Sequence, residues 1–150
     1  MTLTQKENGL LCDLKSQEQL CIEKYTKYES EACDPQLKSL FSSIKTTEQS
    51  HLDTINKMLG GEEVKMPGTT PEAKKWMGTA SSCSAEQKSK DAFLCKDALT
   101  MEKHVSSVYD TAIFEFNSTT MRDTLAHIQK EEQNHGEQIY SYMSANSMYS

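Results

Sequence analysis

Acidic and imidazole side chains recur in this sequence at a fixed spacing. Each of two sets holds a glutamate, a second glutamate 30 residues later and a histidine three residues beyond that. The second set repeats the first after 84 residues. The six residues are Glu18, Glu48, His51, Glu102, Glu132 and His135. A repeat of this kind predicts a paired site, with one half of the ligands supplied by each half of the chain.

The chemistry that suits four carboxylates and two imidazoles is a dinuclear centre of iron or manganese, with iron favoured. Two divalent ions carry four positive charges, which four glutamates neutralise. A Glu-x-x-His pair offers one oxygen and one nitrogen from the same helical face, and this is the ligand pattern of ferritin-like carboxylate proteins. In each set we expect the first glutamate to be a terminal ligand, the second to bridge both ions and the histidine to bind one. Open coordination positions would bind oxygen or hydrogen peroxide.

Two other interpretations of the six residues stay open at this point. The glutamates and histidines could form solvated helix faces, or they could form a buried charge network that holds no metal. Apolar residues share their helical register, for example Leu14 and Cys21 on either side of Glu18, which favours burial. A buried network of four carboxylates with two histidines is costly without a cation.

Other polar residues lie near the six. Tyr25 and Tyr109 each follow the first glutamate of their set by seven residues, two helical turns. They are either amphipathic core residues or hydrogen-bond donors that orient the glutamates. Glu131 neighbours Glu132 but falls outside the apolar register, so we expect it to be solvated. His104 and His127 also fall outside that register and are expected at the surface.

The elements that must position these residues are four helices, because apolar residues and ligands recur at alternating spacings of three and four. The helices are expected at about 5–33, 36–59, 86–117 and 120–145. The connection at 60–85 contains most of the glycines and all but one of the prolines. Short connections make each pair of helices an antiparallel hairpin. The sequence therefore predicts an all-α fold: a single domain over 1–150, a ferritin-like antiparallel four-helix bundle whose two hairpins are joined by a long crossover.

Composition excludes several classes of protein. Only 36% of the residues are hydrophobic, and the formal charge is −6 with no basic cluster, so we expect neither a membrane span nor nucleic-acid binding. The polar start MTLTQKENG is not a signal peptide, so secretion is not expected. Five scattered cysteines without a C-x-x-C pair favour reduced thiols in the cytoplasm over a disulfide framework or a zinc site.

The segments DPQLKSLF at 34–41 and IQKEEQNHGEQI at 128–139, with the helical stretches around them, resemble the spore coat F (CotF-like) family of ferritin-like proteins from endospore-forming bacteria. More distantly, the ligand layout is similar to that of rubrerythrins and bacterioferritins. Rubrerythrins carry an additional glutamate where this chain has Val105. They also usually carry a rubredoxin domain, for which no C-x-x-C exists here, so any electron donor is a separate molecule.

The resemblance implies one of two functions. The first is a dimetal oxidoreductase of a spore-forming bacterium that oxidises iron(II), acting as a ferroxidase, or consumes peroxide or oxygen. The alternative is a structural spore coat protein with little or no catalysis. The expected location is the mother-cell cytoplasm or the spore coat, and the expected assembly is a homodimer or the coat itself.

Overall fold

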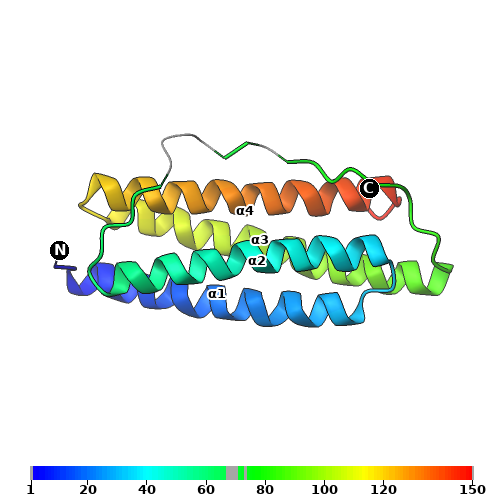
Figure 1. Ribbon diagram of the computed structural model, residues 1–150, viewed down its shortest axis with the longest axis horizontal. Coiled ribbons are helices and arrows are strands. Elements are labelled where there is room, and N and C mark those ends of the chain that lie inside the picture. The colour runs from blue at the N-terminus through cyan, green and yellow to red at the C-terminus, as the bar shows by residue number, and fades with distance from the viewer. Residues whose placement is uncertain (1, 67–70, 73, 150) are drawn as a thin grey trace.

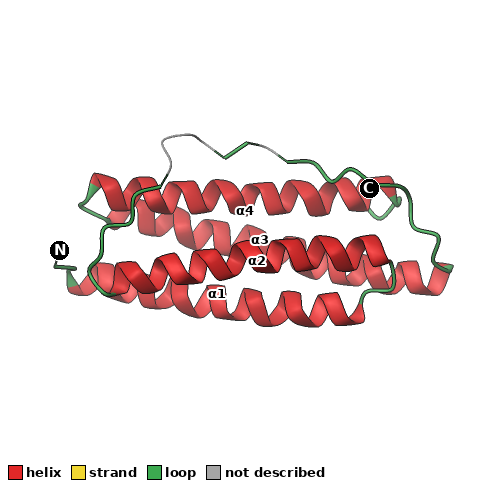
Figure 2. Ribbon diagram, in the orientation of Figure 1, coloured by secondary structure: helices red, strands yellow, loops and turns green. Residues whose placement is uncertain are grey.

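The computed structural model describes residues 2–66, 71–72 and 74–149. Every regular element in these ranges is a helix, as Figure 2 shows by colour. The helices are α1 (Gln5–Glu31), α2 (Pro35–Leu59), α3 (Ala85–Glu115) and α4 (Thr119–Ala145). They lie side by side as a four-helix bundle (Figure 1). The predicted all-α bundle is therefore confirmed.

Two antiparallel hairpins, α1–α2 and α3–α4, make up the bundle (Figure 1). Helix α1 also packs against α3, and α2 packs against α4. The described parts of the connection between α2 and α3 follow α4 from one end of the bundle to the other. The side-chain amide of Asn134 on α4 donates to the carbonyl of Glu72 at 2.8 Å. Further along, the Trp76 ring lies edge-on against Tyr142 with centroids 4.9 Å apart.

Three of the helices begin one residue before the predicted 36, 86 and 120, because a capping side chain stands immediately ahead of each. The side chains of Asp34, Ser84 and Ser118 accept hydrogen bonds from backbone N–H groups of the first turn. Such a cap stabilises a helix by about 1 kcal/mol. The first helix starts at Gln5 as predicted, behind the capping box of Thr4 and Glu7.

Each hairpin turn is held by a carboxylate from the other hairpin. Asp91 on α3 is fully buried and accepts hydrogen bonds from the backbone N–H groups of Cys33 and Asp34. Glu7 on α1 accepts one from the N–H of Asn117. These contacts draw the turn residues out of helical geometry, so α1 and α3 each end two residues before the predicted 33 and 117. The 84-residue repeat therefore includes the turns as well as the ligands.

Replacing Asp91 with alanine is expected to lower the free energy of unfolding by about 2–4 kcal/mol, because two turn N–H groups lose their acceptor. Urea unfolding of the metal-free protein, followed by circular dichroism, measures the loss. The matched variant Asp91→Asn keeps one side-chain oxygen that can accept from a turn N–H group, so its loss should be smaller. An Asp91→Ala loss no larger than that of Asp91→Asn would contradict the role assigned to Asp91.

Fully buried apolar residues fill the bundle on both sides of a polar layer at the middle of the helices. Leu14 and Cys21 lie on either side of Glu18 along α1, and Ile44 and Ile55 enclose the polar positions of α2. None of these four apolar side chains is more than 1% exposed. The register predicted from the sequence is correct, and it places the polar layer inside the core.

Candidate metal centre

The polar layer consists of the six residues that the sequence singles out, and all of them are buried. None is more than 4% exposed. Because each helix contributes from near its midpoint, the six side chains converge on the centre of the bundle. They come from α1 (Glu18), α2 (Glu48, His51), α3 (Glu102) and α4 (Glu132, His135). This burial rules out the interpretation that they form solvated helix faces.

Two overlapping groups of ligand atoms form within this layer, and within each group the atoms lie at most 4.8 Å from one another. We call them the His51 group and the His135 group. The His51 group is Glu18, Glu48, His51 and Glu132. The His135 group is Glu48, Glu102, Glu132 and His135. Glu48 and Glu132 belong to both groups, which is the position that bridging carboxylates would take.

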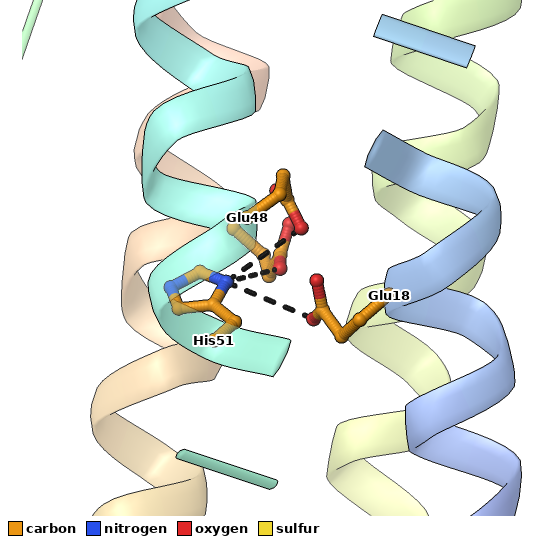
Figure 3. Close-up of side chains that lie close together, drawn as sticks. Glu18, Glu48 and His51 are labelled. Carbon is orange, nitrogen blue, oxygen red and sulfur yellow. Dashed lines mark hydrogen bonds and ion pairs between the residues drawn. The ribbon is translucent and has the colours of Figure 1, made fainter. Parts of the chain in front are cut away.

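In the His51 group, the histidine points its Nδ1 at the carboxylates (Figure 3). This nitrogen lies 2.9 Å from Glu132 Oε1. It lies 3.6 Å from Glu48 Oε2 and 3.7 Å from Glu18 Oε1. Neighbouring ligands of one ion with bonds of about 2.1 Å stand roughly 3 Å apart, so these separations suit a shared cation.

The His135 group has the same arrangement. His135 Nδ1 lies 2.8 Å from Glu48 Oε1. It lies 3.4 Å from Glu102 Oε1 and from Glu132 Oε2. The two histidine rings face each other across the layer with centroids 6.0 Å apart. The cluster is therefore nearly symmetric, as the repeated spacing predicts.

Buried atoms without a hydrogen-bond partner test whether these residues suit a metal. Among the described residues, the buried side-chain oxygens and nitrogens that lack a partner all belong to this cluster. They are Glu18 Oε2, Glu48 Oε1 and Oε2, Glu102 Oε2, Glu132 Oε2 and His135 Nδ1. Glu48 Oε1 and His135 Nδ1 lack a partner although they lie 2.8 Å apart, because their geometry is not that of a hydrogen bond. An unsatisfied buried polar group costs about 1–3 kcal/mol, and cations bound between these carboxylates and histidines would supply the missing partners. The residues fit a metal.

Without a cation, protons compensate for part of the buried negative charge. Burial and the neighbouring Glu48 carboxylate raise the pKa of Glu18 to about 8. Burial and nearby carboxylates raise the pKa of Glu132 well above its ordinary range. Burial opposes the charge of Glu48 too, but the nearby Glu18 carboxyl and the two histidines, whose Nδ1 atoms lie 3.6 Å and 2.8 Å from its oxygens, hold its pKa well below normal. Burial also works against protonated His51 and His135, yet the surrounding carboxylates raise the pKa of each well above normal.

Two buried tyrosines hold the terminal glutamates across the hairpins. The hydroxyl of Tyr25 on α1 donates to Glu102 on α3. The hydroxyl of Tyr109 on α3 donates to Glu18 on α1 at 2.6 Å. Burial, with the adjacent carboxylates, raises the pKa of both tyrosines well above normal, so both stay protonated donors. Both tyrosines are buried core residues and at the same time hydrogen-bond donors to the glutamates. The two interpretations that the sequence left open for them therefore both apply.

Glu131 is the residue near the cluster whose position the sequence did not indicate. Expected to be solvated, it is instead only 30% exposed at its side chain, and its Oε1 lies 3.3 Å from His51 Nε2. The hydrogen bond from His51 lowers the pKa of Glu131. His127 Nε2 lies 3.5 Å from the same oxygen and is 17% exposed, so it is less open to solvent than expected. Helical periodicity alone could not show that α2 faces this side of α4.

Cavities reach the cluster from two directions. A groove of about 530 Å³ between α3 and α4 is lined by Glu102, Glu132 and Gly136 among others. A smaller cavity of about 270 Å³ lies between α2 and α4, beside the connection, and its lining includes His135 and Thr47. The two cavities therefore border the cluster, one between α3 and α4 and the other between α2 and α4.

The fold and this cluster define a four-helix bundle with a buried carboxylate–histidine site. Comparison with protein families shows that residues 90–150, which span most of α3 and all of α4, match the Coat F domain. This match confirms the resemblance to the spore coat F family over that hairpin. The likeness to rubrerythrins and bacterioferritins is not shown and stays a prediction. No curated protein and no solved structure matches the chain. None of the helices in the described ranges is long and apolar enough to cross a membrane.

Proposed function

We propose that this chain is a spore coat protein whose bundle binds two divalent ions of iron or manganese. The Coat F domain over residues 90–150 supports the coat assignment. The observation that carries the metal site is the convergence of six buried ligands in two groups, together with the six buried atoms of these residues that have no hydrogen-bond partner. The ions would neutralise the carboxylates and hold the two hairpins together, since each group of ligands draws on both of them.

Elemental analysis tests the metal site. The protein is purified without chelators, or stripped and reloaded with iron(II) or manganese(II) in the absence of oxygen, and its metal content is measured per chain. Two ions per chain are expected. The variant Glu23→Gln, which removes an exposed carboxylate of α1, should bind the same number. Fewer than one ion per two chains in both native and reloaded protein would overturn the proposal.

A second candidate function is oxidation of iron(II), or consumption of oxygen or peroxide, with a separate electron donor. The groove between α3 and α4 favours it, because Glu102 and Glu132 are among the residues that line this groove. Once bound, the ions would supply redox chemistry, while the protein's own residues hold them and limit access to them.

Electrode measurements of oxygen and peroxide consumption, with excess iron(II) as the reductant, distinguish the two functions. A catalytic protein consumes oxidant through many turnovers, and Glu48→Gln abolishes that consumption. A structural coat protein consumes at most the amount needed for its own two ions. Immunolabelling of intact and coat-stripped spores from the source bacterium then tests the location.

A further inference from the structure

The 84-residue repeat breaks at the residue that precedes each bridging glutamate. Glu131 precedes Glu132 on α4, whereas Thr47 holds the equivalent position before Glu48 on α2. The ligands and the tyrosines that hold them obey the repeat. The two halves therefore present the same groups to the ions but support their histidines differently.

His51 has a carboxylate behind it. With Nδ1 turned to the cluster, its Nε2 carries the proton of the metal-binding tautomer and donates to Glu131 at 3.3 Å. His127 Nε2 also lies 3.5 Å from this oxygen of Glu131. A carboxylate that accepts from a ligand histidine fixes the tautomer and the ring orientation and makes the ligand nitrogen more basic.

His135 has no such support. Within the described residues, none donates to or accepts from its Nε2, and its ring borders the cavity of about 270 Å³ that Thr47 also lines. The groove between α3 and α4 is lined by Glu102, which belongs to the His135 group alone, and by Glu132, which belongs to both groups. By contrast, Glu18 and His51 line neither of these two cavities.

We propose that the two ions are held unequally: the His51 group binds one divalent cation tightly in a closed position, and the His135 group binds the second more weakly, in exchange with solvent. The inference rests on the proposed function, since the cluster must bind cations at all. Closed metal positions are typical of structural sites and open ones of reactive sites. The first ion would stabilise the bundle, and the second position would be the one that external ions and small molecules reach.

Anaerobic titration of the metal-free protein with manganese(II) tests the inequality. Calorimetry gives the stepwise affinities, and electron paramagnetic resonance counts the free ion. Two steps separated by at least about tenfold are expected. His135→Ala should keep the tighter step and His51→Ala only the weaker one, which assigns each step to its group.

The supporting carboxylate is tested by a reciprocal pair of variants. Glu131→Gln should weaken the tighter step by about 10–100-fold, the usual effect of losing a carboxylate behind a ligand histidine, and should leave the weaker step unchanged. Thr47→Glu places a carboxylate at the equivalent position behind His135, where the cavity has room, and should strengthen the weaker step. Chemical unfolding of the metal-free variants shows whether either change acts on the fold instead.

The outcomes separate the two proposals. A protein that binds no manganese and no iron refutes the proposed function itself. Two ions that bind with equal affinity refute the inequality alone. A Glu131→Gln variant that weakens both binding steps by the same factor, or that weakens neither step, also refutes the inequality.

Discussion

Replacing Glu48 with glutamine is expected to remove both ions from the protein, whereas replacing Glu18 should remove one. The reason is geometric. Glu48 contributes to both ligand groups, and its two oxygens are both buried without a hydrogen-bond partner. Glu18 contributes only to the His51 group. A glutamine offers one neutral oxygen in place of a bridging carboxylate, so neither ion keeps its charge balance.

Metal content per chain measures this difference. We expect two ions in the native protein, about one in Glu18→Gln and Glu102→Gln, and close to none in Glu48→Gln and Glu132→Gln. Helical content by circular dichroism serves as the folding control, because glutamine has nearly the shape of glutamate and removes a buried charge. Loss of a single ion in Glu48→Gln, with the other retained at native affinity, would contradict the bridging role.

Removing the metal from the native protein should lower its melting temperature by about 10–20 °C. A ligand present at 100 times its dissociation constant stabilises the folded state by about 2.7 kcal/mol, so two ions contribute about 5 kcal/mol. A domain of this size shifts by about 2–4 °C per kcal/mol. We expect a large effect because bound ions would give partners to buried oxygen and nitrogen atoms at the centre of the bundle that otherwise have no hydrogen bond.

Thermal unfolding with and without a strong chelator checks this expectation, and re-addition of metal should restore the higher value. The double variant Glu48→Gln, Glu132→Gln is the matched control. It should melt at one temperature regardless of chelator, because it has no ion to lose. A native protein whose melting temperature ignores the chelator would show that the cluster contributes no metal-dependent stability.

Much of this architecture could be predicted from the sequence because periodicity and spacing are local properties. The alternation of three and four placed Glu18 on the same face as Leu14 and Cys21, and all three are buried. Capping residues then set the helix starts to within one residue. The ends of α2 and α4 fall where they were predicted, whereas those of α1 and α3 fall two residues early, because Asp91 and Glu7 act on turns that lie far away in sequence.

The sequence could not show which helices pack against one another, or through which faces. Glu131 lies outside the apolar register of α4, and only its approach to His51 on α2 reveals its contact with the cluster. The same is true of the crossed tyrosine contacts, since Tyr25 donates to Glu102 in the opposite hairpin and not to a glutamate of its own helix. Partners across a bundle are set by packing, which the order of residues in one helix does not encode.

The Coat F domain match covers one hairpin, and that hairpin holds three of the six ligands. A protein built from this hairpin alone would complete the site only by pairing with an identical copy, and its two ion positions would then be equivalent by symmetry. Two hairpins in one chain remove that constraint. Each half can change independently, so that Glu131 supports one histidine while Thr47 leaves the other free. If the cluster binds two ions as proposed, carrying both halves in a single polypeptide would allow it to hold two different ions or to give them two different tasks.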